Sequence, residues 1–399
     1  MSTTAPERAT VAIHPAIVPL VAVCCGVTVA NIYIAHPILT LLAEEFFGAR
    51  DANAGVVVTI AQIAYAAGLF FLVPLGDVVR RKRLLTVLVT GTALALLVAG
   101  ASLTLPMLAV ATVALSAMTV APHVLIPFVV SAVPRQRQGR ALATISAGMT
   151  GGIVLSRVVD GAIGDWFGWS AVYFTAAALT IAVGLTTALL LPDEPRREAV
   201  AYPRLILSML VLLRDQPVVR WAVAIQIPVF GTFTFIWVMI VFLLTGTYGM
   251  SVASAGLFGL FALITMATAP LVGRVMDRFG SVRLMAACLV VLMLGAATML
   301  ASEAHLAFVV LGIMLLNVGQ QGTQIGNQSR VLNLLPEARS RLNTLYMTSN
   351  FVGGAAASLG ASWIYGAFGW GGVALGAFVT SIVAMTVFLL ERLRSRVGA

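Results

Sequence analysis

The sequence predicts an all-α membrane protein whose twelve transmembrane helices form two similar six-helix bundles. Composition is the first reason, because 60% of its 399 residues are hydrophobic and only 10% are charged, whereas a soluble domain carries about 25% charged residues. A series of long apolar runs and an internal repeat are the second and third reasons. With a mean hydropathy of +1.01, the chain has too little polar surface for water, and lipid is its expected solvent.

The apolar runs follow one another along the whole chain, and a helix needs roughly 20 apolar residues to cross the hydrocarbon layer. Six runs lie in the first half of the chain and six in the second. They cover residues 17–41, 54–75, 84–104, 107–131, 140–163 and 169–191, then 218–244, 252–272, 282–301, 305–329, 341–365 and 371–390.

Between the two sets lies the longest polar stretch. It contains a short apolar piece, residues 205–213, which Arg204 and Arg214 flank. This piece is too short to span a membrane, so we expect a helix that lies in the interface. The chain therefore divides into an N-terminal bundle over residues 1–191, a cytoplasmic linker over 192–217 and a C-terminal bundle over 218–399.

The basic residues predict the orientation of these bundles. If the N-terminus is cytoplasmic, all of the 24 Lys and Arg residues except Arg50 and Arg157 fall in cytoplasmic loops and tails. Positive residues stay on the cytoplasmic side during insertion. We therefore expect a multi-pass protein of a bacterial cytoplasmic (inner) membrane with both termini in the cytoplasm. The charges follow membrane topology, so the net charge of +9 does not indicate nucleic-acid binding.

The two halves repeat each other at an offset of about 200 residues. Asp77 and Asp277 follow the second and the eighth run, and Phe167-Gly168-Trp169 matches Phe368-Gly369-Trp370. Two homologous halves indicate a pseudo-two-fold transporter with its substrate site near the bilayer midplane. The loop after the eighth run also resembles the G-x-x-x-D-R-x-G-R-R/K motif of the major facilitator superfamily, of which it keeps Gly273, Asp277, Arg278 and Gly280.

Shorter segments are similar to the drug/proton-antiporter and sugar-efflux branch of this superfamily: Ala30-Asn31-Ile32-Tyr33, His36-Pro37 and Arg341-Leu342-Asn343. The resemblance implies a monomeric secondary active transporter in the lipid bilayer that moves a small-molecule substrate by alternating access. It favours efflux coupled to protons. A proton-coupled or facilitative uptake permease, or a non-transporting sensor of the same fold, stays open as an alternative.

The motif loops are candidates for a conformational latch. In the family they form charge contacts that hold one arrangement of the halves and break in the other. The alternative is that these charges serve only as a topology signal. The latch residues predicted from the resemblance are Asp77, Arg81, Lys82, Asp277 and Arg278.

Amide side chains in the tenth run recur every three or four residues and so mark one helix face. Unpaired amides that face hydrocarbon cost several kcal/mol each, so this face must meet water, substrate or another helix. Hydrogen bonding between helices is the alternative to lining a cavity. The cavity-lining candidates are Asn317, Gln320, Gln321 and Gln324, while Asn327 and Gln328 lie near the helix end and could cap it.

Ionisable residues inside membrane spans are expensive and mark functional sites by default. His36 and His123 are candidates for substrate binding and, together with Asp160, for proton coupling. Either histidine could instead be a neutral ring bonded to a neighbouring helix. Arg157 is the basic residue inside a span, with Asp160 three positions on. The two could neutralise each other, or Arg157 could meet an anionic substrate.

Further substrate-binding candidates are Asn31 and Tyr33 in the first run and Gln226 and Trp237 in the seventh, where helix packing is the alternative. Few carboxylates fall in or next to the runs, so a site for dications is not expected. The spacing of Cys24, Cys25 and Cys288 fits no metal site, and neither a phosphate-binding loop nor an H-E-x-x-H motif occurs. We therefore expect neither a cofactor nor an enzyme activity.

Overall fold

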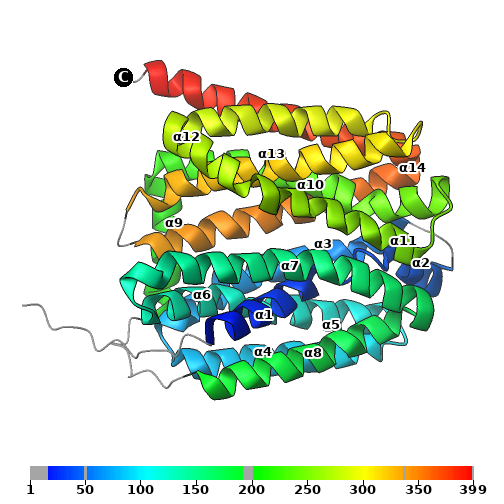
Figure 1. Ribbon diagram of the computed structural model, residues 1–399, viewed down its shortest axis with the longest axis horizontal. Coiled ribbons are helices and arrows are strands. Elements are labelled where there is room, and N and C mark those ends of the chain that lie inside the picture. The colour runs from blue at the N-terminus through cyan, green and yellow to red at the C-terminus, as the bar shows by residue number, and fades with distance from the viewer. Residues whose placement is uncertain (1–16, 49–51, 192–200, 336–337, 398–399) are drawn as a thin grey trace, which may run out of the picture.

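The computed structural model describes residues 17–48, 52–191, 201–335 and 338–397. All regular structure in these ranges is helical (Figure 1). The first half contains α1 (Ile17–Ala30), η1 (Asn31–Tyr33), α2 (Leu39–Phe47), α3 (Gly55–Phe71), η3 (Val73–Asp77), α4 (Arg81–Gly100), α5 (Leu105–Met118), α6 (Ala121–Ala132), α7 (Arg135–Phe167) and α8 (Trp169–Leu190).

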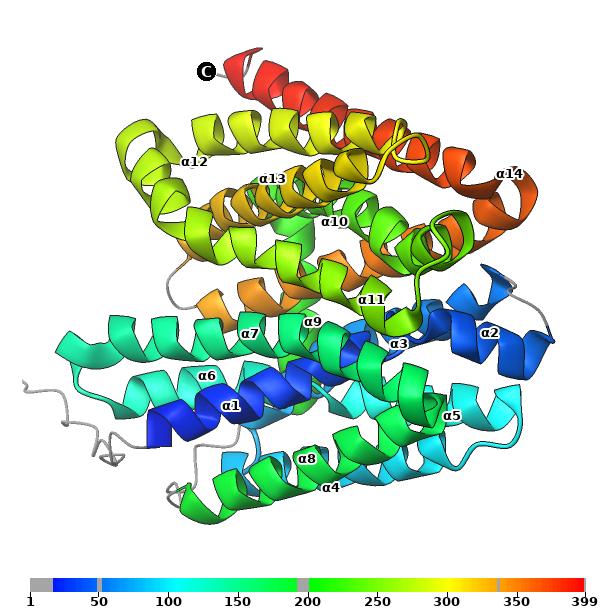
Figure 2. The same cartoon turned by 45° about the vertical axis from the view of Figure 1, so that its right-hand side comes forward.

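The linker helix α9 (Tyr202–Asp215) follows the first half. The second half contains α10 (Pro217–Phe242), the π-helical turn η4 (Leu243–Thr247), α11 (Val252–Gly256), η5 (Leu257–Leu263), α12 (Ile264–Met299), α13 (Leu306–Leu332) and α14 (Arg339–Val397). Figure 1 shows α1–α8 as the lower layer and α10–α14 as the upper layer, and the turned view in Figure 2 keeps this division.

The predicted twelve spans are confirmed. The described residues contain nine helices that are long and apolar enough to cross a membrane, and a shorter apolar helix at Ile17–Tyr33. Two of the nine each hold two spans that reverse direction at a glycine, Gly280 with a φ of 80° and Gly369 with a φ of 64°. Such positive φ values suit glycine because it has no Cβ.

Proline explains why two spans are broken rather than continuous. The first span leaves helical geometry around Pro37, between η1 and α2, and the fourth is interrupted next to Pro122, where α6 begins. A proline inside a helix removes one hydrogen bond and clashes with the preceding turn. The broken segment of the first span carries His36, so the break sets the position of that ring.

Glycines bring α1 and α7 into backbone contact. A Cβ added to Gly152 would lie 2.4 Å from the carbonyl oxygen of Gly26, and one added to Gly148 would lie 2.4 Å from that of Ala22. Small residues let membrane helices approach in this way. This close contact sets the rotation of α7 about its axis, and it thereby decides which α7 residues point away from α1.

We expect Gly152→Ala to lower the thermal stability of the purified protein, because the new methyl group meets backbone that cannot turn aside. Overpacking of this kind costs about 1–3 kcal/mol. Gly151→Ala is the matched control, since nothing lies within 4 Å of a Cβ there. The melting midpoints of both variants are measured by tryptophan fluorescence in detergent. Equal midpoints would contradict the close contact of α1 with α7 at Gly152.

The two halves contact each other at the end of the molecule that lies far from the basic loops. The Ser358 hydroxyl of α14 donates to the Gly55 carbonyl of α3 over 3.2 Å. A Cβ added to Gly256 of α11 would lie 2.5 Å from the Arg157 carbonyl oxygen of α7. We call this region, between α3 and α14 and between α7 and α11, the distal contact.

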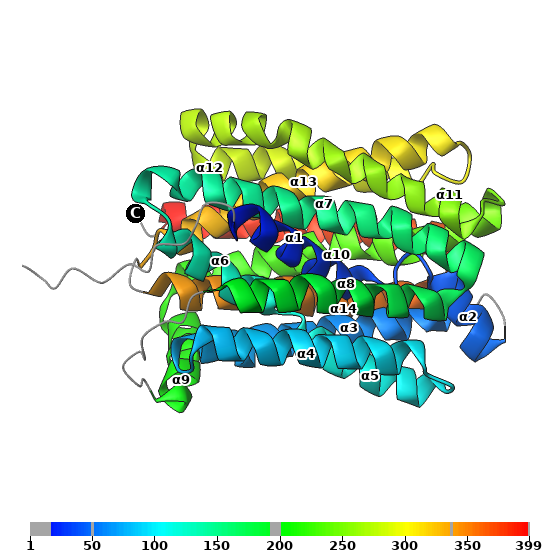
Figure 3. The same ribbon diagram turned by 60° about the horizontal axis from the view of Figure 1, so that its bottom comes forward.

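The linker helix α9 lies at the opposite end, where the basic loops gather (Figure 3). The Tyr202 hydroxyl donates to the Phe71 carbonyl at the end of α3 over 2.7 Å. Met209 is fully buried in a cluster that includes Ala222 of α10 and Tyr346 of α14. A helix therefore occupies the predicted linker position and is anchored to both halves, while its place at the membrane interface stays a prediction.

Candidate functional site

A central cavity of about 320 Å³ lies on the seam between the two halves. Side chains from α1, η1, α3, α6 and α7 of the first half line it, as do side chains from α10, η5, α12, α13 and α14 of the second half. Its size is within the usual range for small-molecule sites. It contains seven of the predicted substrate-binding residues: Tyr33, His123, Arg157, Asn317, Gln320, Gln321 and Gln324.

A second cavity lies next to the central one, toward the basic loops. His123 lines both, and the second cavity, of about 350 Å³, also contacts Leu332, Arg339 and Asn343. In the other direction, Arg157 and His36 border a space of only about 20 Å³, which is room for about one water molecule. The two larger cavities therefore lie on the basic side of Arg157, and only the small space lies toward the distal contact.

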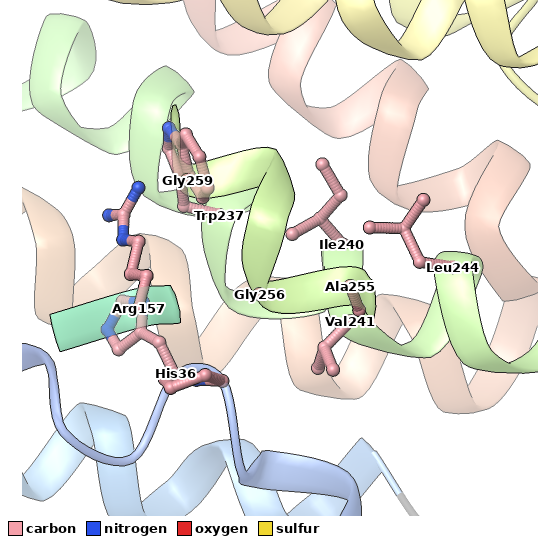
Figure 4. A pocket seen from close by; sticks show the side chains of 10 residues that line it. His36, Arg157, Trp237, Ile240, Val241, Leu244, Ala255, Gly256 and Gly259 are labelled. Carbon is pink, nitrogen blue, oxygen red and sulfur yellow. The ribbon is translucent and has the colours of Figure 1, made fainter. Parts of the chain in front are cut away.

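Arg157 lies where the cavity narrows and is 5% exposed. Its guanidinium carbon is 3.6 Å from the centroid of the Trp237 ring and 5.8 Å from that of Tyr33. Figure 4 shows the guanidinium group beside Trp237, with His36 on the other side of the space. Trp237 belongs to the second half, so this stack joins the two halves next to the distal contact.

Arg157 and Asp160 do not neutralise each other, since no salt bridge joins them in the part of the chain that the structure describes. Asp160 lines a separate cavity together with residues of α1 and α8, whereas Arg157 lines the central one. The Arg157 Nε atom is buried and has no hydrogen-bond partner. The self-neutralising pair is therefore absent among the described residues, and a meeting of Arg157 with an anionic substrate stays a prediction.

Four of the predicted substrate-binding residues lie outside the central cavity, and two of these, Asn31 and Gln226, form hydrogen bonds to other helices. The Asn31 amide donates to the Thr180 hydroxyl of α8 over 3.0 Å. Gln226 is fully buried and accepts from the Tyr346 hydroxyl over 2.5 Å. Both therefore make the helix-to-helix hydrogen bonds that were the alternative for polar residues in these spans.

His36 and Trp237 lie at the closed end rather than in the central cavity. The His36 ring meets Tyr33 edge-on, with 5.4 Å between the ring centroids. Neither ring nitrogen makes a hydrogen bond of good geometry, although the ring lies near the Trp237 backbone. His123 differs, because its Nε2 atom is 3.1 Å from the Tyr65 hydroxyl.

The amide face of α13 divides along its length. Gln320 donates to Gln324 over 2.6 Å and both line the cavity. Asn327 instead donates to the Ala222 carbonyl of α10 over 2.8 Å, and Gln328 donates to Asn343 of α14 over 2.7 Å. The last two tie helices together and do not cap α13.

The two motif loops differ in the structure. Arg81 lies 3.8 Å from Asp77 in an i,i+4 ion pair within the first half, and its Nε donates to the Gly76 carbonyl. Asp277 and Arg278 are exposed and form no salt bridge with the described residues, although Arg278 lies 5.1 Å from the Phe279 ring centroid. The ion pair is local to one half, and the latch role of Asp77, Arg81, Lys82, Asp277 and Arg278 stays a prediction.

Several residues of the cavity wall are absent from the predicted site. Tyr65, Phe230, Asn350 and Phe351 all line it. Asn350 carried a usable signal, since it is an amide inside an apolar run. The aromatic residues carried none, because a cavity wall and a packed core use the same residue types.

Glu391, which directly follows the last apolar run, is also absent from the predicted residues. It is 6% exposed and forms a two-pronged salt bridge with Arg330, one arm of which is 3.1 Å long. The pair joins α13 to the end of α14, away from the cavity. No group of three or more His, Cys, Asp and Glu side chains that could hold a metal occurs among the described residues.

Comparisons with known proteins agree with this architecture. The "Probable transporter SCO4007" of Streptomyces coelicolor is 36% identical over 357 residues, which cover 89% of this chain and 83% of that protein. The "Putative uncharacterized transporter YgaY" of Escherichia coli K12 is 31% identical over 379 residues, which cover 94% of this chain and 95% of that protein.

Solved structures show the same fold at low sequence identity. The POT family transporter PepTSo aligns with a TM-score of 0.74 at 12% identity and covers 96% of this chain and 98% of that one. The nucleoside transporter NupG aligns with a TM-score of 0.72 at 15% identity, over 93% and 99% of the two chains. The family model described as Major Facilitator Superfamily matches residues 21–268 and 223–398. This chain therefore belongs to the Major Facilitator Superfamily of membrane transporters.

Proposed function

We propose that this protein exports a small organic solute across the bacterial cytoplasmic membrane and couples export to proton entry. The observation that carries the proposal is the central cavity. Both halves line it, a second cavity toward the basic end shares His123 with it, and only a space of about 20 Å³ lies toward the distal contact. With the basic end in the cytoplasm, as the loop charges predict, this is the conformation that takes up solute from the cell interior.

In this proposal the halves, residues 1–191 and 218–399, rock against each other about the cavity while residues 192–217 connect them. The distal contact then opens as the basic end closes. Efflux is proposed because of the resemblance to the efflux branch and because a solute in the cytoplasm can enter the cavity in this state. Facilitated export, which needs no added energy source, would use the same rocking movement, and so would import of the solute.

Protons are proposed as the coupling ion because ionisable groups lie next to the path. His123 borders both cavities, His36 borders the closed end, and Asp160 lies on the opposite side of α7 from the seam. A group that alternates between water and a closed interior changes its proton affinity with conformation. This gives the cycle a means of linking solute and proton movement.

The test uses the full chain in liposomes with a pH-sensitive dye in the lumen. The solute is the compound that most raises the melting temperature in a screen of sugars, amino acids, aromatic acids and lipophilic cations. We expect counter-movement of solute and protons, and weaker coupling in His123→Asn. If the rate of solute movement is the same with and without a pH gradient, the protein is a facilitated transporter and is not coupled to protons. A bound solute that never moves would indicate a sensor.

A further inference from the structure

We infer that the central cavity binds a small organic anion with an apolar body, and that Arg157 is the residue that receives its acidic group. The inference rests on the proposed transport function, since it names the substrate class of the same cavity. It depends on three features: the charge of the lining, the state of Arg157 and the chemistry of the remaining walls.

The described lining of the path is positively charged. Arg157 borders the central cavity and the closed end, and Arg339 borders the cavity toward the basic end. No Asp or Glu lines any of these three spaces among the described residues. An electropositive, low-dielectric cleft concentrates anions and repels cations. A cationic solute would find no opposite charge in this path.

Arg157 lacks the partners that a buried arginine normally has. Its guanidinium forms no hydrogen bond or salt bridge with another described residue, and Asp160 faces a different cavity. The rings of Trp237 and Tyr33 stabilise the cation through their faces but accept none of its N–H groups. A guanidinium carries five N–H donors in a planar fork that matches a carboxylate.

The other walls suit an apolar body with a few hydrogen-bonding groups. Phe230 and Phe351 lie 5.4 Å apart between ring centroids, and Phe230 and Phe233 lie 5.8 Å apart. Across the cavity, α13 presents the amides of Gln320 and Gln321. An aromatic monoacid can therefore place its carboxylate on Arg157 and its ring among the phenylalanines.

The experiment compares matched compounds on the purified full-length protein. Benzoate, phenylacetate, indole-3-acetate and 2-naphthoate are each tested against the corresponding neutral amide and the corresponding amine. We expect members of the acid series to raise the melting temperature and to bind at least about 30-fold more tightly than their amides, as the loss of a buried charge pair implies. Amines should not bind. An amide or amine that binds as well as its acid would overturn the inference, as would a panel in which no acid binds.

Variants locate the acidic group. Arg157→Gln should weaken acid binding by at least about 30-fold, and Arg157→Lys should retain part of it, because lysine keeps the charge but not the planar fork. Arg140→Gln is the matched control, since Arg140 belongs to the same helix and is exposed outside the cavity. If Arg157→Gln fails to fold, Arg157→Lys and the acid–amide comparison on the wild type still decide. Equal acid binding by Arg157→Lys and wild type, with no preference over the amide, would sink the assignment.

Transport assays separate this inference from the proposed function. A neutral solute that binds and moves through liposomes would remove the anion site but keep the transporter. An acid that binds through Arg157 but does not move would keep the anion site and remove transport. The two ideas therefore fail in different arms of the experiment.

Discussion

Gly256→Ala should reduce transport by at least about tenfold while the protein remains folded. The new Cβ would lie 2.5 Å from the Arg157 carbonyl oxygen and 3.6 Å from the Gly161 Cα atom. A carbonyl in a helix cannot rotate away, so α7 and α11 must separate. Overpacking costs about 1–3 kcal/mol, and it destabilises only those conformations that are closed at the distal contact.

A bias of that size shifts a two-state equilibrium by about 5- to 150-fold, away from the state in which the cavity is open at the basic end. The measurements are solute flux in liposomes and labelling of Gln321→Cys with an impermeant thiol reagent added from the basic side. Cys24, Cys25 and Cys288 are buried and should react little. Gly151→Ala serves as control because its Cβ has no neighbour within 4 Å. Wild-type flux and labelling in Gly256→Ala would show that the distal contact does not govern access.

Glu391→Gln should cause the largest loss of stability among single charge changes at the basic end. The side chains of Arg330 and Glu391 are 14% and 7% exposed, so removal of the carboxylate leaves a largely buried cation. Breaking a buried ion pair by changing one partner costs about 3–5 kcal/mol. We expect the melting midpoint to fall by roughly 5–15 °C.

Removing both charges tests the mechanism. The double variant Arg330→Met with Glu391→Leu should recover much of the lost stability, because apolar replacement of a buried pair is often neutral or better. Glu303→Gln, at an exposed glutamate, is the control for the loss of one carboxylate. If Glu391→Gln melts with Glu303→Gln, or if the double variant melts lowest, the pair is not a buried stabilising contact.

The fold could be predicted because its signals are repeated many times along the chain. Each span needs only a sufficiently long apolar run, and each loop adds basic residues on one side. Gly168-Trp169 in the first half and Gly369-Trp370 in the second lie at equivalent turns, each before the last span of its half. Helix ends were less predictable: α7 and α13 continue into the basic loops beyond their apolar runs. Backbone hydrogen bonds, unlike hydropathy, do not stop at the membrane surface.

The site could be predicted only in part, because a polar residue in a span can satisfy its hydrogen bonds in two ways. Gln320 and Gln226 look alike in sequence, yet Gln320 lines the cavity and Gln226 bonds to Tyr346. The difference lies in the rotation of each helix, which the packing of other helices decides. For Arg157 and Asp160, the three-residue spacing allowed a pair, but close contact of α1 with α7 at Gly148 and Gly152 turned the two side chains toward different spaces.

The anchoring of α9 sets a limit on how far the molecule can swing apart. Its Tyr202 hydroxyl forms a hydrogen bond with the end of α3, while Met209 is buried beside α10 and α14. A short helix that is attached to both halves allows them to rotate against each other but resists their separation. We therefore expect α9 to limit how far the basic end can widen during the proposed movement.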